Sequence, residues 1–209
     1  MPSFPKPPTL NDDERAIDIY REAAHIIRDK GFDATSMGDI AKAVDLTKGG
    51  LYYYIKGKEA LLYAIMCFAL EELDRRVLAP AQKISEPSQR LAHMLSAHLK
   101  LVLDETNAMV VLADELEGLS PEHRRTIEER YMQYRDALRD TAASMLAESG
   151  HRTLDPSVAA GALCSLAEGV VRWFDAERHP QRDHVVEQVT RMALQSLDPG
   201  AGASNQAVA

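Results

Sequence analysis

The sequence predicts an all-α protein, and three observations support this prediction. No alternation of apolar and polar residues persists along the 209 residues, so nothing in the pattern favours β-strands. Apolar residues instead recur at helical spacing, as they do at Ile17, Tyr20, Ala24 and Ile27. With 45% hydrophobic residues, the chain can also build a buried core of packed helices.

Capping residues, glycines and prolines set the expected limits of the helices. Acidic residues at 12–14 favour a helix start, and Gly31 is expected to end that helix. A later long helix should stop before Pro80, because a proline disfavours helical backbone in the residue that precedes it. Pro121 suits the first turn of another long helix. The expected helices span about 12–30, 36–43, 47–54, 58–78, 87–104, 107–117, 121–150, 155–175 and 182–197.

The two ends of the chain and its composition narrow the class of protein. Residues 1–11 carry four prolines and should form a flexible arm, and the Gly- and Ala-rich residues 199–209 should be a disordered tail. The longest nearly continuous apolar run, 60–70, is too short for a membrane span of about 20 residues. The N-terminus lacks the apolar core of a secretory signal, and two cysteines cannot form a disulfide framework. A cytoplasmic protein is expected.

The charge of the chain is unevenly distributed. The net charge of −8 argues against a protein that coats nucleic acid through bulk charge. The stretch 46–58 nevertheless contains Lys48, Lys56 and Lys58 and no acidic residue. This local basic segment in an acidic chain is the first indication of a small nucleic-acid contact surface.

The same stretch contains the pattern of a helix-turn-helix. Leu46 closes a turn, and Thr47 is a good N-cap for the helix that follows. Two short helices would bury one shared apolar face, made of Ile40, Ala41, Val44, Leu51 and Ile55. Such a pair leaves its second helix free to enter a DNA major groove.

A longer match makes the pattern more specific. Residues 31–36 (GFDATS), 40–41 (IA) and 47–61 (TKGGLYYYIKGKEAL) resemble the DNA-binding domain of the TetR/AcrR family of bacterial transcriptional regulators. The resemblance covers about residues 12–62. It implies a three-helix DNA-binding domain at 12–57 and a helical ligand-binding and dimerisation domain at 58–198. It also implies a homodimer that represses transcription from a palindromic double-stranded DNA operator until a small molecule releases it.

The sequence departs from the family pattern at three positions. Asp45 stands at the turn position that usually holds glycine, and aspartate tolerates a positive φ better than most residues. Gly50 replaces a small side chain of the recognition helix, which removes a possible base contact. Ile55 replaces an aromatic residue and should change packing alone.

The candidate DNA-contacting residues follow from the resemblance and from their chemistry. Lysines and hydroxyl groups contact phosphates, and side chains at the start of the second helix read base edges. Tyr54 is expected in the core, whereas the other two tyrosines of the triplet should contact DNA. The alternatives are structural roles without DNA contact: half-buried packing for the tyrosines, a solvated face for the lysines and a simple N-cap role for Ser36. The full candidate set is Thr35, Ser36, Thr47, Lys48, Gly49, Gly50, Tyr52, Tyr53 and Lys58.

The remaining helices are expected to hold an apolar effector. Residues 169–174 (GVVRWF) resemble a segment of the acyl-CoA-responsive members of the family, which implies a long apolar ligand with a charged head, such as an acyl or sterol-derived CoA thioester. Arg135 or Arg172 would meet the head. Methionines suit an adaptable cavity, although they are also ordinary core residues. The candidate ligand-binding residues are Met94, His98, Met109, Leu112, Tyr131, Tyr134, Arg135 and Trp173.

The last two helices should form the dimer interface, because each carries small or apolar residues along one face. A monomer core would use the same faces. These residues are Val158, Ala159, Ala162, Leu166, Val170, Val185, Val189 and Met192.

Catalysis, metals and cofactors are not expected. The histidines lack metal-ligand spacing, and no phosphate-binding glycine loop or nucleophile motif occurs. Two alternatives to a DNA-binding regulator stay open: a helical ligand-binding or scaffolding protein without DNA binding, and a small helical enzyme.

Overall fold

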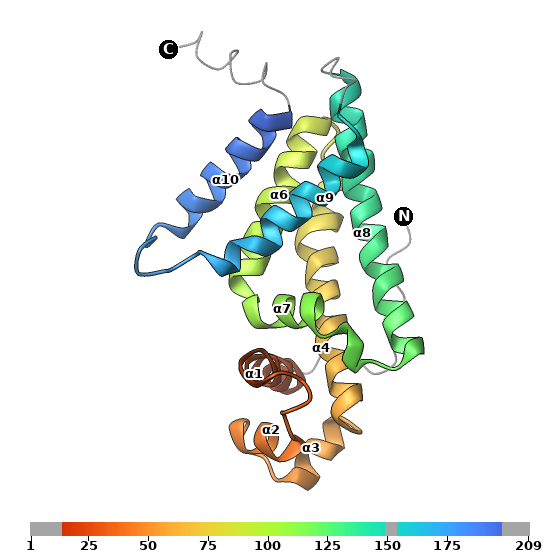
Figure 1. Ribbon diagram of the computed structural model, residues 1–209, viewed down its shortest axis with the longest axis vertical. Coiled ribbons are helices and arrows are strands. Elements are labelled where there is room, and N and C mark those ends of the chain that lie inside the picture. Colours follow the sequence, from red (N-terminus) through yellow and green to blue (C-terminus); the bar gives the residue numbers. More distant parts are fainter. Residues whose placement is uncertain (1–13, 149–153, 198–209) are drawn as a thin grey trace. The chain divides into compact units, whose positions relative to one another are not determined.

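The computed structural model describes residues 14–148 and 154–197 (Figure 1). Every regular element in these two ranges is a helix, and neither range contains a strand, so the all-α prediction is confirmed. The expected arm at 1–11 and tail at 199–209 lie outside the described residues. No helix in the described part is long and apolar enough to cross a membrane.

The chain forms two compact units. The first consists of residues 1–72 and 105–131, and the second of residues 73–104 and 132–209. The chain therefore crosses from one unit to the other three times, and α4 and α7 belong with the N-terminal helices by their contacts.

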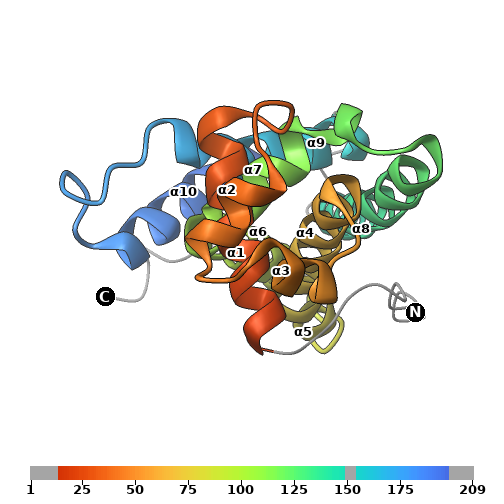
Figure 2. The same ribbon diagram turned by 90° about the horizontal axis from the view of Figure 1, so that it is seen from below.

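Three short helices begin the first unit. They are α1 (Glu14–Lys30), α2 (Met37–Ala43) and α3 (Lys48–Tyr54), and α2 packs against both of the others (Figure 2). The first helix ends at Gly31, whose φ of 82° is unfavourable for other residues. Ile19, Ile40 and Leu51 are fully buried in this unit, which confirms that the helix pair shares an apolar face.

The rest of the first unit supports these helices. α4 (Lys58–Leu73) is buried almost all round from Leu61 to Leu70, as expected for a helix enclosed by protein. α7 (Thr106–Asp114) packs against α1. α7 is shorter than the expected 107–117 helix, and a single 3₁₀ turn (Leu116–Gly118) follows it before α8 (Pro121–Glu148) begins.

In the second unit, α6 is the central helix. It packs against α9 and α10, which lie beside it in Figure 1. Residues 74–81, which precede α6 in this unit, are helical and also pack against it. The elements are a π-helical turn (Asp74–Leu78), α5 (Ala79–Ala81), α6 (Pro87–Asp104), the later part of α8, α9 (Pro156–Gly169), a 3₁₀ turn (Val170–Arg172) and α10 (Arg182–Leu197).

Two expected helix ends are wrong. The long helix does not stop before Pro80, because the helical path runs on to Ala81. A π turn precedes the proline, with the Ala79 N–H bonded to the Asp74 carbonyl five residues back, and this wider turn accommodates a residue that has no N–H. The helix expected at 155–175 ends at Gly169 and tightens into a 3₁₀ turn, in which the Trp173 N–H donates to the Val170 carbonyl three residues back, as is common at helix ends.

Candidate nucleic-acid interface and interior polar site

The turn between α2 and α3 is built by capping and by one unusual backbone angle. Ser36 caps α2 through a capping box, in which the Asp39 N–H donates to Ser36 Oγ at 3.1 Å and the Ser36 N–H donates to Asp39 Oδ2 at 3.0 Å. Asp45 has a φ of 52°, as expected for the residue that replaces a turn glycine. The hydroxyl of Ser36 also donates to Asp39, so the serine is at least an N-cap.

Thr47 fixes the start of α3. Its hydroxyl accepts a hydrogen bond from the Gly50 N–H at 3.0 Å. A Cβ at Gly50 would lie 3.3 Å from Thr47 Oγ1 and 3.8 Å from Leu46 Cβ, so a larger residue at this position would crowd the cap. Local packing therefore explains why position 50 holds glycine. The glycine also removes a side chain that could contact a base.

The outer face of α3 is polar and accessible. Lys48 and Gly49 are exposed at its first turn, where the helix would meet a groove. Tyr53 is 86% exposed and Tyr52 43%, although both are large side chains that would gain from burial. Tyr54 is half-buried and meets Tyr53 edge-on, with ring centroids 5.4 Å apart. The two outward tyrosines and Lys48 thus form one candidate contact surface.

Two of the residues predicted to contact DNA interact with other parts of the protein. Thr35 is only 3% exposed, and its hydroxyl donates to the Gly31 carbonyl at 2.8 Å, so it lies in the core and not at the surface. Lys58 Nζ donates to the Asp33 carbonyl at 3.0 Å and lies 4.4 Å from the centroid of the Phe32 ring. Lys58 therefore joins the start of α4 to the loop after α1, with ammonium protons left for a phosphate.

Arg15 is a residue that the sequence reasoning missed. Its guanidinium donates to the carbonyl of Val44, the residue that caps the end of α2. Arginines often bind helix-terminal carbonyls, but nothing in the sequence pattern indicates which carbonyl this one meets. It holds α1 against the first helix of the pair.

The predicted ligand-binding residues do not gather in one unit. Met109, Leu112 and Tyr131 belong to the first unit, and the remaining five belong to the second. Trp173 is 51% exposed and meets His179 edge-on, and Arg135 is exposed. Of the set, the structure joins His98 and Tyr134 directly.

His98 of α6 and Tyr134 of α8 form a buried polar pair inside the second unit. The Tyr134 hydroxyl lies 2.8 Å from His98 Nδ1, and the two rings meet edge-on. Burial lowers the pKa of His98 to about 4, so its ring is neutral near pH 7. Burial also raises the pKa of the Tyr134 phenol, and nearby Cys164 and Glu168 of α9 raise it further.

A shallow pocket of about 180 Å³ opens on the surface of α8 and α9. Its lining combines apolar and charged side chains, but Arg139 already pairs with Asp136 at 2.6 Å and with Asp140 at 2.8 Å. The lining residues are Met132, Arg135, Asp136, Arg139, Ser157 and Ala160.

The faces predicted for dimerisation divide into an outer and an inner set. Val158 and Met192 are 61% and 59% exposed. Ala159 and Val170 are buried within the second unit instead. The outer set is consistent with a surface that another protein chain covers.

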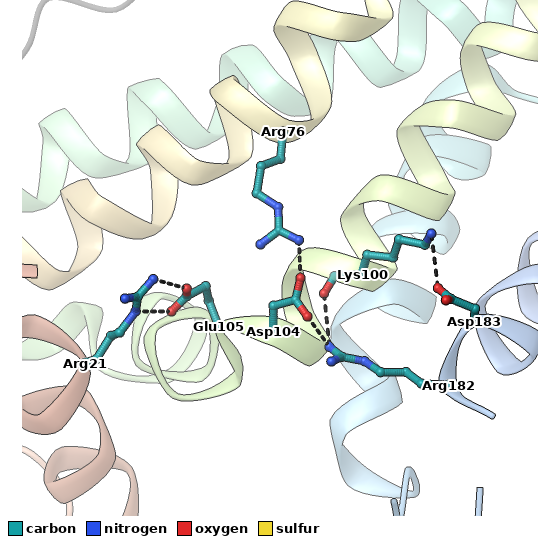
Figure 3. Close-up of polar contacts among 7 residues, drawn as sticks. All are labelled: Arg21, Arg76, Lys100, Asp104, Glu105, Arg182 and Asp183. Atoms are coloured by element: carbon teal, nitrogen blue, oxygen red, sulfur yellow. Dashed lines mark hydrogen bonds and ion pairs between the residues drawn. The ribbon is translucent and has the colours of Figure 1, made fainter. Parts of the chain in front are cut away.

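Ion pairs fix the residues at the junction of α6 and α7 (Figure 3). In the second unit, Asp104 pairs with Arg76 and, at 2.7 Å, with Arg182 at the start of α10. In the first unit, Glu105 accepts two hydrogen bonds from Arg21, at 2.6 and 3.1 Å. Consecutive carboxylates thus anchor the chain within each unit.

No group of three or more potential metal ligands occurs in the described ranges. The two cysteines, Cys67 and Cys164, are buried and reduced. Burial raises the pKa of the Cys67 thiol to about 11, which makes it a poor nucleophile.

Comparison with known proteins links both parts of the chain to one group of regulators. Residues 19–65 match the model described as bacterial regulatory proteins of the tetR family. Residues 85–197 match the model described as the tetracyclin repressor-like C-terminal domain. These two matches cover most of the described residues.

Individual relatives agree with this result. The chain is 26% identical over 119 residues to the transcriptional repressor KstR2 of Mycolicibacterium smegmatis, which covers 57% of this chain and 56% of that protein. It is 25% identical to the fatty acid metabolism regulator protein of Bacillus subtilis, over 53% of this chain and 57% of that protein. The matched segments thus span little more than half the length of these curated relatives.

Solved structures match over a longer range. The structure of AibR in complex with isovaleryl coenzyme A and operator DNA is 31% identical, covers 89% of this chain and 99% of its own, and gives a TM-score of 0.77. The structure of KstR2 of Mycobacterium tuberculosis is 22% identical and also gives a TM-score of 0.77, over 89% of this chain and 95% of its own. The second likeness bears on the fold alone.

Proposed function

The chain belongs to the TetR family of bacterial regulatory proteins, and we propose that it acts as a repressor that a hydrophobic small molecule releases from DNA. Membership follows from family models that match residues 19–65 and 85–197. It makes the chain a DNA-binding transcriptional regulator. Repression, the operator and the ligand are the proposed parts.

The observation that carries the proposal is the outer face of α3. An exposed lysine and two exposed tyrosines stand on a helix that Thr47 caps firmly and whose opposite side is buried at Leu51. Lys48 reaches a guanine edge or a phosphate, and the hydroxyls of Tyr52 and Tyr53 donate to phosphates. We assign DNA contact to residues 12–57 and ligand binding with dimerisation to residues 58–198.

A homodimer fits the proposal. Two copies related by two-fold symmetry would place two α3 helices on the half-sites of a palindrome. The outer residues of α9 and α10, among them Val158 and Met192, would form the shared interface. Sedimentation of the wild type and of Val158→Glu tests this: the wild type should sediment as a dimer and the variant as a monomer with reduced operator affinity.

The ligand proposal rests on the interior of the second unit and on the relatives. AibR was solved with isovaleryl coenzyme A, which supports an acyl-CoA thioester as the ligand of this chain. A sterol-derived CoA thioester is the other proposed ligand. Release requires that the ligand bind the DNA-free conformation more tightly than the DNA-bound one, because equal affinity would shift nothing.

A gel shift with DNA from the upstream region of the protein's own gene tests the proposed function. The wild type should bind this DNA in preference to unrelated DNA, and a ligand of the right class should abolish the shift. Lys48→Ala should weaken binding, whereas Lys100→Ala, which removes a lysine of the second unit, should leave it unchanged. A protein that binds ligand but no DNA would instead be a helical ligand-binding protein.

A further inference from the structure

One atom of the buried pair His98 and Tyr134 is not explained by packing. Both side chains are 1% exposed, and their mutual hydrogen bond uses His98 Nδ1. The other ring nitrogen, Nε2, is also buried and has no hydrogen-bond partner among the residues that the structure describes. A buried polar atom without a partner costs free energy that an apolar side chain of similar size would not.

The direction of the existing hydrogen bond decides what Nε2 can do. A phenol is a better donor than an imidazole N–H, and an imidazole nitrogen is a better acceptor than a phenol oxygen. The 2.8 Å contact is compatible with either tautomer of His98, and on the ground of these strengths we assign the Tyr134 hydroxyl as the donor to His98 Nδ1. Because the buried ring is neutral, it carries a single hydrogen, which this arrangement places on Nε2. His98 thus holds an unused N–H donor in the interior of the second unit.

Apolar side chains and one negative charge belong to the surroundings of the His98–Tyr134 pair. The same face of α6 carries Met94, Leu101 and Val102, each at most 1% exposed. The charge of Glu168, on α9, acts on the Tyr134 phenol. An anionic ligand group would be repelled there and would also be costly to bury, whereas a neutral acceptor avoids both costs.

We infer that the Nε2–H of His98 binds a carbonyl oxygen in the uncharged, largely apolar part of a ligand, and that α6, α8 and α9 hold this part. This inference rests on the proposed function and specifies the ligand chemistry of that site. The carbonyl belongs either to an acyl thioester or to a cyclic ketone, and the two sources are distinguished by experiment. Tyr134 is a positioning residue, because it holds the histidine in the tautomer that donates.

Matched ligands with and without the carbonyl test the inference. Isovaleryl coenzyme A is compared with the S-alkyl thioether of the same carbon skeleton, and a cyclic ketone with the hydrocarbon in which CH₂ replaces C=O. Affinity is measured by calorimetry and by the fluorescence of Trp173, the sole tryptophan. For whichever pair binds, the wild type should prefer the carbonyl compound by about tenfold, the equivalent of one hydrogen bond.

Three variants locate the effect. His98→Leu should bind both members of the pair within about twofold of each other, and Tyr134→Phe should give an intermediate preference because the tautomer is no longer fixed. His93→Leu is the matched control: the Nε2 of this half-buried histidine of the same helix also lacks a partner among the described residues, but no tyrosine fixes its tautomer, so its loss should not affect the preference. Should His98→Leu fail to fold, ¹⁵N NMR of the wild-type imidazole should show Nε2 protonated and its shift changing when the carbonyl ligand binds.

Several results would overturn the inference. Equal binding of the carbonyl and carbonyl-free compounds by the wild type, or an undiminished preference in His98→Leu, removes His98 from ligand recognition. Binding of neither pair excludes the neutral carbonyl class, while a normal gel shift would leave DNA binding intact. Tight carbonyl-specific binding without any gel shift would instead contradict the proposed function alone.

Discussion

At the residue scale, Gly118 is the position where a single methyl group should matter most. A Cβ there would lie 2.6 Å from Phe32 Cδ1 and 2.7 Å from Leu62 Cδ2. Both neighbours are buried and cannot both move aside without opening the core of the first unit. We therefore expect Gly118→Ala to lower the free energy of unfolding by about 1–3 kcal/mol, measured by urea denaturation.

Gly169 supplies the control for this substitution. No atom lies within 4 Å of a Cβ built on it, and its φ of −70° suits any residue. Gly169→Ala should leave stability unchanged or raise it by up to about 1 kcal/mol, because alanine reduces the entropy of the unfolded chain. Equal stability of the two variants would contradict the packing argument at Gly118.

His98 gives stability a dependence on pH. Its pKa is about 4 in the folded protein, compared with 6.5 for an unperturbed histidine, because burial disfavours the charged ring. The unfolded chain therefore takes up a proton first as the pH falls, and stability is lost between about pH 6.5 and 4. The full loss is about 3 kcal/mol for a shift of this size. Urea midpoints from pH 7 to 4 should show a shallower fall in His98→Gln.

Residues differ in how far the sequence predicts their roles. Asp45 could be predicted as the positive-φ turn residue, because the requirement is local. The burial of Thr35 and the attachment of Lys58 to Asp33 could not, because they depend on where the loop after α1 meets α4. Both residues carry groups that suit phosphate, and side-chain chemistry alone does not reveal a competing partner inside the fold.

At the element scale, α3 was predictable because its cap, its buried leucine and its polar face all lie within one short segment. The contact surface of this helix is tested by Tyr52. If the Tyr52 ring packs on the DNA backbone and its hydroxyl adds one hydrogen bond, Tyr52→Phe should cost about 1 kcal/mol of operator affinity and Tyr52→Ala more. Fluorescence anisotropy with labelled operator gives the affinities. Wild-type affinity in Tyr52→Ala would exclude the residue from the interface.

The π turn before Pro80 could not be predicted from the sequence, because it departs from the usual helical pattern. The ion pairs of α6 could not be predicted either, because they join residues that are distant in sequence. Asp104 pairs with both Arg76 and Arg182. Because neutralising it leaves two arginines without this partner, Asp104→Asn should cost about 1–2 kcal/mol of stability, with the partial exposure of all three groups limiting the effect.

Asp183 is the matched control for Asp104. Its carboxylate is 88% exposed and pairs only with Lys100 among the ion pairs described, at 3.1 Å. Asp183→Asn should change stability by under about 0.5 kcal/mol in 150 mM salt. A cost equal to that of Asp104→Asn would mean that the shared carboxylate contributes no more than a surface pair.

At the scale of the whole molecule, the net charge of −8 opposes DNA binding, whereas the basic segment at 46–58 favours it. Bulk charge repels the duplex, so affinity must come from a few local phosphate contacts, and each adds about −0.9 to the slope of log K against log salt. With about three contacts in each copy of a dimer, the slope should be about −5.

Lys48→Ala alters both copies, so it should make this slope shallower by about 2 if Lys48 contacts phosphate. If the same lysine reads a base instead, the slope should stay near the wild-type value, and discrimination against one substituted base pair per half-site should fall by about 1–3 kcal/mol. Titrations from 50 to 300 mM salt, on the operator and on substituted operators, separate these two roles. Lys100 lies in the second unit, so Lys100→Ala should change neither the salt slope nor the discrimination between base pairs. If Lys100→Ala changes the slope as much as Lys48→Ala does, overall charge, rather than α3, governs binding.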